Sequence, residues 1–479
     1  MEDSGITKEG VVSDIKKRIL PSFVPHSGLL DKLLEKVEEI DIREISGVDH
    51  TGDVPIWQLV VISIDATMDL ATKNSWNICR HNGFSYIYNG AYWYHLNDDE
   101  FMQFLGKVSH KLGVQLLRSR HFDFRKKLLS QFFAVADLPA PAGRTNSTLI
   151  NLVNGTLELS PETVTLRSFC PGDFLKYQLP FRYDPMAAAP LFMRYLNRVL
   201  PHVELQNILS KYIGYVFIPS SLLKLEKTIL LYGAGANGKS VFFDIINALL
   251  SRENVSNYSL AKLTDENGYY RAMIGNKLVN YASEINRKLD TAFFKQLVSG
   301  EPIEARLPYG QPFILENYAK FIFNTNELPR DVEHSNAYFR RFLIIPFDVI
   351  IPENEQDKSL AYKIIDKELP GVLNWVLEGL KRLTVNHKFT HSSLVENQIR
   401  QYKDEADTCF LFLEEFGYAP DINNTMPLKE IYTEYKFFCR DNNYMAFSNR
   451  VFKKHLEGRK FSFHRTTVGH LIYCSKQIK

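Results

Sequence analysis

Apolar residues recur along this chain of 479 residues in two different rhythms, and the change between them divides the chain into regions. In the first 50 residues and again over 100–117, apolar side chains fall at helical spacing, as Leu29, Leu33 and Val37 do. Between residues 225 and 351, short apolar runs alternate with helical segments, which is typical of an α/β domain. Longer helical stretches follow. The pattern therefore predicts an α/β core flanked by regions that are mostly helical.

Turn-forming residues indicate where these regions end. The Pro, Ala and Gly run over 139–143 is the clearest linker signal in the first half of the chain. From these breaks we predict four domains: a mostly helical N-terminal domain over 1–145, a helical collar over 146–220, the α/β domain over 221–385 and a helical C-terminal domain over 386–479.

A β-hairpin is expected inside the N-terminal region, where two aromatic-rich runs flank Asn89 and Gly90. The Asn-Gly dipeptide favours a two-residue type I′ turn, because both central residues of that turn need positive φ. The acidic run 98–100 that follows is typical of a helix cap and first turn.

Composition excludes several classes of protein. Lys and Arg number 57 against 55 Asp and Glu, so a uniformly basic nucleic-acid coat and an acidic disordered chain are both excluded. Aromatic residues make up 13% of the chain, which argues against disorder over most of its length. The basic charge is concentrated at the C-terminus, where residues 421–479 hold 11 basic and 5 acidic side chains.

Cysteine usage and apolar runs bear on the compartment. Five scattered cysteines without a CxxC pair predict reduced thiols in a cytosol-like compartment and give no zinc ribbon. The acidic, polar N-terminus has no apolar segment of a signal peptide. The densest apolar run, 342–351, is interrupted by Pro346 and Asp348 and is too short to span a bilayer. We expect a cytoplasmic protein without a membrane partner.

A phosphate-binding loop lies at the start of the α/β region. An apolar strand over 227–232 leads into Gly-Ala-Gly-Ala-Asn-Gly-Lys-Ser, and an apolar helix follows, which is the strand–loop–helix context of a P-loop. Its glycines let backbone N–H groups converge on phosphate at a helix N-terminus. Lys239 would reach the β- and γ-phosphates and Ser240 would ligate Mg²⁺, so ATP and Mg²⁺ are the expected cofactors. The candidate nucleotide-binding residues are Gly233, Gly235, Asn237, Gly238, Lys239 and Ser240.

Three later strands end or begin in residues that suit phosphoryl transfer. Glu284 ends a strand about 45 residues after the loop, where a carboxylate can orient water and help to hold Mg²⁺. Asn326 follows a third strand and can sense the γ-phosphate. Arg340 and Arg341 open a fourth strand, where an arginine can act as a finger across a subunit boundary. Any strand can end in Glu, and a solvated strand end is the alternative interpretation of the arginine pair.

Several motifs stand in a fixed order that resembles the superfamily 3 helicases, above all the phage and plasmid primase–helicase family. They are the loop GAGANGKS, the strand with Glu284, the segment KQLVSGEPIEAR, the sequence TNELP, and RRF at the fourth strand. The resemblance covers about 145–385 and is weaker over 80–145.

This resemblance implies a hexameric AAA+ P-loop ATPase that translocates on single-stranded DNA through a central pore. It places Gly238, Lys239 and Ser240 on the Walker A positions, Glu284 on the Walker B carboxylate, Asn326 on the sensor, and Arg340 or Arg341 on the finger. Arg341 is favoured because it directly abuts the apolar strand. Lys295, Arg306 and Tyr309 fall in the pore motif, where cations meet phosphates and an aromatic ring can stack on a base.

The chain also departs from that family. Ser283 precedes Glu284, so one carboxylate must serve where two acids are common. The first 145 residues lack the length and the metal-binding spacing of a primase, so the expectation is a helicase with a separate primase or polymerase as partner. The last 60 residues predict two helices and a short β-wing and resemble a winged-helix module; a helical cap with solvated lysines is the alternative.

Two functions are compatible with these features. The first is an ATP-dependent hexameric helicase that acts on single-stranded and forked DNA during replication of a mobile element, in a bacterial host or phage-infected cell. The alternative is a nucleotide-dependent DNA-binding switch or scaffold without unwinding activity. The segment from Lys295 to Tyr309 distinguishes these two functions, because a nucleotide-dependent switch does not need a pore segment that contacts DNA.

Overall fold

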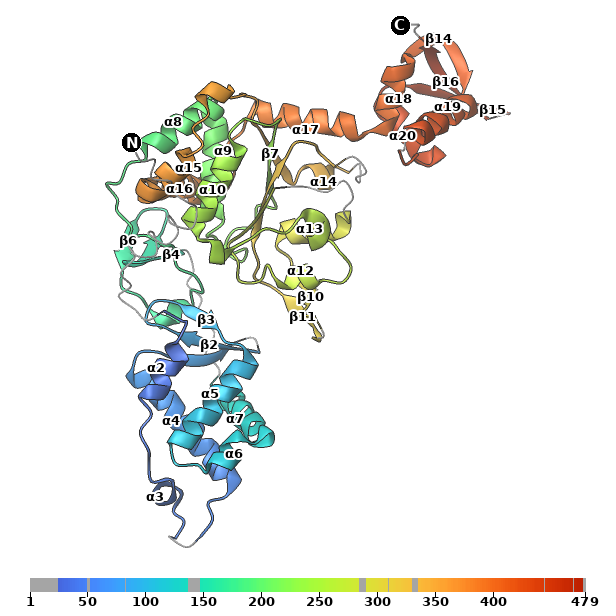
Figure 1. Cartoon of the computed structure of the whole chain (residues 1–479). Coiled ribbons are helices and arrows are strands. Elements are labelled where there is room, and N and C mark those ends of the chain that lie inside the picture. The colour runs from blue at the N-terminus through green and yellow to red at the C-terminus, as the bar shows by residue number, and fades with distance from the viewer. Residues whose placement is uncertain are drawn as a thin grey trace.

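The computed structural model describes three packed regions that follow one another along the chain, and the C-terminal region stands at the far end of one long helix (Figure 1). The residues described are 25–49, 52–81, 83–136, 147–283, 290–308, 310–329, 335–442, 444–467 and 469–476.

The N-terminal unit is mostly helical, as its apolar spacing predicts. Its helices are α2 (Leu29–Glu35), α3 (Ile42–Ser46), α4 (Ile56–Lys73), α5 (Asp98–Lys111), α6 (Leu116–Arg120) and α7 (Phe122–Val135). A single buried apolar cluster that runs from Leu29 to Ala136 joins them. The predicted acidic first turn of α5 is confirmed, but its cap is Asn97, one residue before the acidic run, which accepts N–H bonds from Asp99 and Glu100.

A small antiparallel sheet completes this unit, with β1 (Ile78–His81), β2 (Phe84–Tyr88) and β3 (Trp93–His95) in that order. The predicted hairpin forms between β2 and β3, but the predicted two-residue turn is wrong. Tyr88 pairs with Trp93, so four residues make the loop. The Asn89 side chain closes it by accepting the N–H groups of Ala91 and Tyr92, each at 3.0 Å.

The next region was predicted to be a helical collar, but it begins with an antiparallel sheet of β4 (Thr148–Leu152), β5 (Gly155–Leu159) and β6 (Val164–Arg167). Ile150 and Leu152 on β4 lie two residues apart, as do Leu157 and Leu159 on β5, so each pair points to one face of the sheet. All four side chains are buried. A short 3₁₀ turn, η1 (Pro171–Asp173), and then the helices α8 (Pro190–Val199) and α9 (Val203–Tyr215) follow.

The core of the molecule is a five-stranded parallel sheet, and the predicted α/β fold is confirmed. Its spatial order is β13 (Phe342–Pro346), β7 (Thr228–Tyr232), β12 (Lys320–Thr325), β9 (Val279–Ala282) and β8 (Val255–Ser256). Because the chain order of these strands is β7, β8, β9, β12, β13, the first strand lies in the interior of the sheet. The carboxyl end of β7 therefore meets that of β12 on one side and that of β13 on the other.

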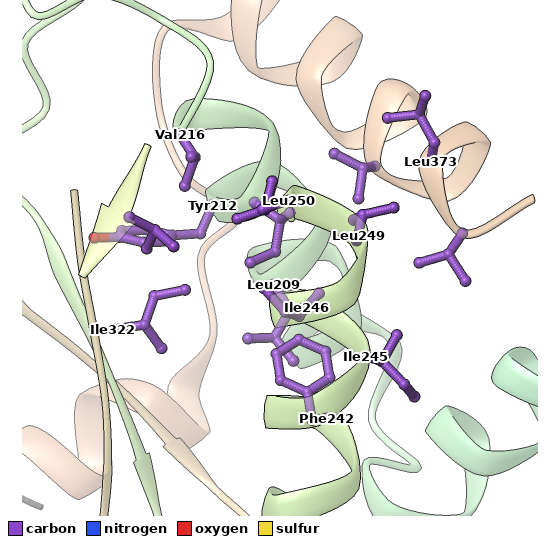
Figure 2. Close-up of a cluster of buried hydrophobic side chains, with 14 of the residues drawn as sticks. Leu209, Tyr212, Val216, Phe242, Ile245, Ile246, Leu249, Leu250, Ile322 and Leu373 are labelled. Carbon is purple, nitrogen blue, oxygen red and sulfur yellow. The ribbon is translucent and has the colours of Figure 1, made fainter. Parts of the chain in front are cut away.

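Helices cover both faces of this sheet, which is the usual reason for continuous apolar strands. On one face, Ile229 and Leu231 of β7 pack with α9 and α10; on the other, Leu230 packs with α11, α13 and α14. The helices after β7 are α10 (Lys239–Leu250), α11 (Leu260–Leu263), α12 (Tyr269–Ala272), α13 (Thr291–Ser299), α14 (Asn336–Phe339), α15 (Leu360–Lys367) and α16 (Leu369–Asn386), with the 3₁₀ turns η2 (Arg252–Asn254) and η3 (Glu353–Glu355). Figure 2 shows Phe242 and Ile246 of α10 in one buried cluster with Leu209 of α9 and Ile322 of β12. This packing fixes α10, and with it the loop at its start.

The C-terminal unit is joined to the core by α17 (Ser393–Ala406), whose Tyr402 belongs to the apolar cluster of the central region. A separate cluster runs from Cys409 to Cys474. Its elements are α18 (Thr408–Phe416), β14 (Tyr418–Pro427), α19 (Leu428–Asp441), α20 (Asn449–Gly458), β15 (Ser462–Thr466) and β16 (Gly469–Lys476). The predicted two helices and wing are present, and sequence inspection missed α18 and β14. Within the described parts of the chain, none of the helices combines the length and apolar character that crossing a bilayer requires.

Candidate active site

The phosphate-type loop joins the end of β7 to the start of α10 and is clamped from two sides. Gly238 has φ +88°, and a Cβ there would lie 2.8 Å from Cγ1 of Val199 on α8. Gly233 has φ +152°, and its Cβ would lie 2.4 Å from the carbonyl oxygen of Phe347. A Cβ at Gly235 would meet nothing within 4 Å. The two flanking glycines are therefore needed for close packing, whereas the middle of the loop is open to a ligand.

Lys239 is folded into this loop. Its side chain is buried, and the ammonium donates to the carbonyl oxygen of Gly233 at 2.6 Å, to that of Ala234 at 3.0 Å and to Oδ1 of Asn237 at 3.2 Å. Burial lowers the pKa of this ammonium. The three N–H donors of this ammonium are all taken by oxygens of the loop, so a phosphate that arrives there must replace some of these bonds.

Asn237, a predicted nucleotide-binding residue, is a brace of the loop. It is buried, and its Nδ2 donates to the carbonyl oxygens of Ala234 at 2.5 Å and Phe347 at 2.9 Å. Ser240 lies in the first turn of α10 and is exposed, so its hydroxyl is accessible to a cation bound with the phosphates.

One residue that supports the loop was missed by sequence reasoning. The hydroxyl of Tyr195 on α8 donates to the carbonyl oxygen of Gly238 at 2.8 Å. Tyr195 lies 43 residues before its partner and belongs to no recognised motif, so nothing local in the sequence marks it.

The tip of β12 lies beside the loop. The N–H of Gly233 donates to the carbonyl oxygen of Thr325 at 3.3 Å, and the next residue, Asn326, is exposed. Asn324 is buried and accepts the hydroxyl of Tyr281 on β9 at 3.1 Å. The predicted sensor position thus lies next to the loop, and the tyrosine fixes the strand on which it is carried.

Glu284, the predicted water-orienting carboxylate, lies outside the described residues. The strand before it, β9, ends at Ala282, which pairs with Phe323 of β12. The carboxyl end of β9 therefore lies on the loop side of the sheet. Among the described residues, no group of three or more His, Cys, Asp or Glu side chains could hold a metal ion by itself. Ser240 is the predicted cation ligand that lies within the described part of the chain.

The two predicted arginines lie at the other end of the sheet. The N–H of Thr228, the first residue of β7, donates to the carbonyl oxygen of Arg341 at 2.8 Å. Five strand residues separate this point from Gly233, which corresponds to about 16 Å. Neither arginine is therefore placed to act on the loop of its own subunit.

The environments of these two arginines differ. Arg341 is only 7% exposed; its Nη2 donates to Oγ of Ser299 at 2.9 Å, and its Nη1 donates to the carbonyl oxygen of Ala337. The side chain of Arg340 is 59% exposed and pairs with Glu226 at 3.0 Å. The sequence-based preference for Arg341 relied on its rigidity. The structure shows that this rigid side chain is enclosed by its own subunit, and that Arg340 is the accessible one.

A β-hairpin forms within the predicted DNA-contacting segment. Strands β10 (Ile303–Arg306) and β11 (Pro312–Leu315) pair antiparallel, and Arg306 ends the first strand opposite Pro312. The exposed Arg306 donates from Nε to the carbonyl oxygen of Gly310 at 3.0 Å, so its guanidinium lies at the loop of the hairpin. Lys295 is half-buried on α13 and is not part of the hairpin, and Tyr309 lies outside the described residues.

Arg271 on α12, which sequence reasoning missed, supports the base of this hairpin. It is 2% exposed, and it donates to the carbonyl oxygens of Glu304 at 2.8 Å and Leu263 at 3.2 Å. Its guanidinium also lies 4.3 Å from the ring centre of Phe293. A buried, charged brace of this kind gives the hairpin a fixed exit direction, which Figure 1 shows as a projection from the sheet domain.

A parallel sheet with a braced phosphate-type loop at the carboxyl end of an interior strand defines the class as a P-loop nucleotide-binding fold. Comparisons with known proteins agree. Residues 65–201 match the family described as D5 N terminal like, and residues 231–341 match DUF5906, a family of unknown function. Both domains are typical of the helicase region of phage and plasmid primase–helicases, so the resemblance to this superfamily 3 family is confirmed.

Individual relatives are distant. A protein of Acanthamoeba polyphaga mimivirus, provisionally described as a helicase, is 23% identical over 311 residues. That match covers 58% of this chain but only 31% of the relative, so the chain spans less than a third of the length of that protein. Two apo structures of the NrS-1 C-terminal region cover 89% and 88% of this chain at 13% identity, with TM-scores of 0.48 and 0.45. At these values the likeness says nothing about function.

Proposed function

We propose that this protein is an AAA+ ATPase that works as a DNA helicase, translocating as a hexameric ring on single-stranded DNA during replication of a mobile element. One relationship carries the proposal: each chain has a braced phosphate loop at one end of its sheet and an exposed arginine about 16 Å away at the other end. Two such ends complete one catalytic site only when neighbouring subunits bring them together.

ATP hydrolysis would use the loop and the strand tips beside it. ATP with Mg²⁺ supplies the transferable phosphoryl group and the cation that neutralises its charge. Backbone N–H groups around Gly235 and the ammonium of Lys239 would bind the phosphates, and Ser240 would hold the cation. Asn326 would position the attacking water at the tip of β12. Glu284, which follows β9 on the same side of the sheet, is the proposed orienting carboxylate.

Arg340 is the proposed finger in place of Arg341. Its guanidinium is exposed at a surface that does not face its own loop, and an arginine supplied from a neighbouring subunit stabilises charge on the transferring phosphoryl group. In the isolated chain Arg340 pairs with Glu226, and this ion pair would break when a phosphate of the neighbouring subunit binds the guanidinium. Arg341 would act as an internal support for the same turn.

DNA contact is proposed at the hairpin and at the C-terminal unit. Arg306 would bind the DNA backbone and Tyr309 would stack on a base, both independently of the DNA sequence. Lys295 on α13, outside the hairpin, would add positive charge. The C-terminal order of helix, strand, two helices and two strands is that of a winged helix, which suits duplex DNA at a fork. A separate primase or polymerase remains the proposed partner.

Unwinding of a forked duplex tests this function. The wild-type chain should displace the paired strand only when ATP and Mg²⁺ are present, and Lys239→Ala should abolish displacement because the phosphates lose their cation. Glu284→Gln should bind ATP and hydrolyse it poorly. The alternative, a nucleotide-dependent DNA-binding switch or scaffold, predicts that DNA binding responds to ATP while no strand is displaced.

A further inference from the structure

Negative charge is concentrated on one edge of the N-terminal unit. Residues 35–49, which include the end of α2, its connection and α3, hold six acidic and two basic side chains. We call this stretch the acidic edge. All six carboxylates are exposed: Glu35, Glu38, Glu39, Asp41, Glu44 and Asp49. Like charges gathered at one place repel each other, so this edge favours a cationic partner.

Positive charge is concentrated on a second edge of the same unit. Residues 115–127, which include α6 and the first turn of α7, hold five basic side chains and one acidic side chain. We call this stretch the basic edge. Its cations are Arg118, Arg120, Arg125, Lys126 and Lys127. Asp123 pairs with Lys127 at 2.8 Å, so the remaining cations set the charge of the edge.

Each edge also exposes apolar surface. On the basic edge, Leu117 is 74% and Phe122 is 66% exposed, and the Lys126 ammonium lies 5.5 Å from the Phe122 ring centre. On the acidic edge, Ile45 is 59% exposed, and an open hollow of 360 Å³ is lined by Asp41, Arg43, Glu44, Gly47, Val48 and Asp49. Exposed apolar surface rimmed by polar residues is typical of interaction sites.

In Figure 1, α2 and α3 are on one side of the unit, α6 and α7 are on the other, and α4 and α5 lie between them. The acidic edge meets the segment just before the basic edge, where the N–H of Ile40 donates to the carbonyl oxygen of Leu112 at 3.4 Å. Among the described residues, no ion pair joins the two edges within one chain. A second copy can pair the two edges, because a head-to-tail contact between two different patches repeats from copy to copy and closes into a ring when the rotation permits.

We propose that the acidic edge of one copy docks against the basic edge of the next copy, so that the N-terminal units form their own ring contact. Single-stranded DNA is the competing occupant of the basic edge, but it leaves the acidic edge without a partner. This interface adds a second contact between neighbouring subunits of the proposed hexamer. The contact itself does not depend on that proposal; only the closure of the contacts into a ring does. Surface ion pairs are individually weak and screened by salt, so this association should weaken steeply as salt is raised.

Charge reversal on each edge gives a direct test. One variant carries Arg118→Glu, Arg120→Glu and Lys126→Glu, and a second carries Glu35→Lys, Glu38→Lys and Glu39→Lys. A control carries Asp65→Lys and Asp69→Lys on α4, which also reverse exposed acidic charges but lie outside both edges. Circular dichroism confirms folding, and sedimentation velocity of the full chain without nucleotide measures assembly at several salt concentrations.

The expected pattern is specific to head-to-tail pairing. Each triple variant alone should dissociate at a concentration at least tenfold higher than the wild type and the control do. An equimolar mixture of the two should assemble again, because their edges are then complementary in alternation. A chain that carries both sets of changes should assemble by itself for the same reason.

Other outcomes would overturn the interface. Assembly unchanged in both triple variants, no recovery on mixing, or a wild-type chain that stays monomeric would each contradict it. Loss of single-stranded DNA binding by the basic-edge variant, with no recovery of assembly on mixing, would assign the edge to nucleic acid instead. Assembly is measured without ATP, so a ring that forms as described but never hydrolyses ATP would contradict the proposed function alone.

Discussion

The hydroxyl of Tyr195 donates a hydrogen bond to the carbonyl oxygen of Gly238 at 2.8 Å, and so ties α8 to the last residue of the phosphate loop. Gly238 has a left-handed backbone, and a Cβ there would also approach Cε2 of Tyr195 to 3.1 Å. The ring and the hydroxyl thus act together: the ring fills the space that the glycine leaves, and the hydroxyl adds a second hydrogen bond to a carbonyl that already accepts the N–H of Phe242 in α10. The geometry of the loop depends on a helix that precedes the P-loop motif.

Tyr195→Phe should weaken nucleotide binding while leaving the fold intact. The ring remains, and a typical buried hydrogen bond contributes about 0.5–1.5 kcal/mol, so affinity for ATP should fall by roughly 2–13-fold. Titration with a fluorescent ATP analogue checks this, and Tyr183→Phe on the same region is a matched control. Affinity equal to that of the wild type would mean that the loop holds its shape without α8.

Arg340→Ala should lower ATP turnover, whereas Arg341→Ala should lower the stability of the fold. Arg340→Ala should leave the melting temperature unchanged and lower turnover by roughly 10³-fold, the scale of an arginine finger. Arg341→Ala removes buried hydrogen bonds to Ser299 and Ala337, so it should lower the free energy of unfolding by about 2–3 kcal/mol.

Mixed assemblies separate a finger that acts between subunits from one that acts within its own. Arg340→Ala subunits keep an intact loop, and Lys239→Ala subunits keep an intact arginine, so mixing them should recover part of the turnover. Thermal unfolding and ATP turnover on the same preparations are the measurements. Recovery with neither arginine variant would contradict a finger supplied between subunits, whereas a stable and inactive Arg341→Ala chain would reverse the assignment of the two residues.

The sequence predicts those parts of the site whose members are adjacent in the chain. The loop from Gly233 to Ser240, the strand before it and the helix after it are local, and a motif captures them. Tyr195 and Arg271 act on atoms 43 and 33 residues away, at Gly238 and Glu304, so only tertiary packing shows their roles.

The remaining errors of sequence reasoning have related causes. Arg340 and Arg341 are chemically identical, and burial alone distinguishes them, because one turns toward Ser299 and the other toward solvent. The region 146–220 contains the predicted helices α8 and α9, but a three-stranded sheet precedes them, because the apolar strands over 148–159 are too short to give a clear period in the sequence. The four-residue loop after β2 arises because the Asn89 side chain takes the place of a backbone bond.

Lys176 should make stability depend on pH. It bridges the N-terminal and central regions, since it donates to the hydroxyl of Tyr86 at 3.2 Å and to Oδ1 of Asn276 at 3.0 Å. Burial lowers the pKa of its ammonium from 10.5 to about 8. The unfolded chain therefore binds more protons than the folded chain between pH 8 and 10.5, so this group makes the folded state more stable as pH rises through that window.

Lys176→Met should flatten that dependence. The variant's free energy of unfolding, measured by urea denaturation at several values from pH 7.5 to 10, should rise less with pH than that of the wild type. Lys381→Met changes an exposed lysine and should keep the wild-type slope. Equal slopes for the Lys176 variant and the wild type would show that this ammonium titrates as it does in water.

Stimulation of ATP hydrolysis by single-stranded DNA tests the central claim most directly, because it requires a nucleotide site and a DNA site that communicate. Wild-type turnover should rise when single-stranded DNA of any sequence is added. Arg306→Ala should keep basal turnover and lose the stimulation, because the hairpin is separate from the loop. Lys358→Ala, which changes an exposed lysine outside the hairpin, should respond as the wild type does. Stimulation that is absent from the wild type, or that persists in full in Arg306→Ala, would contradict a motor that grips DNA through this hairpin.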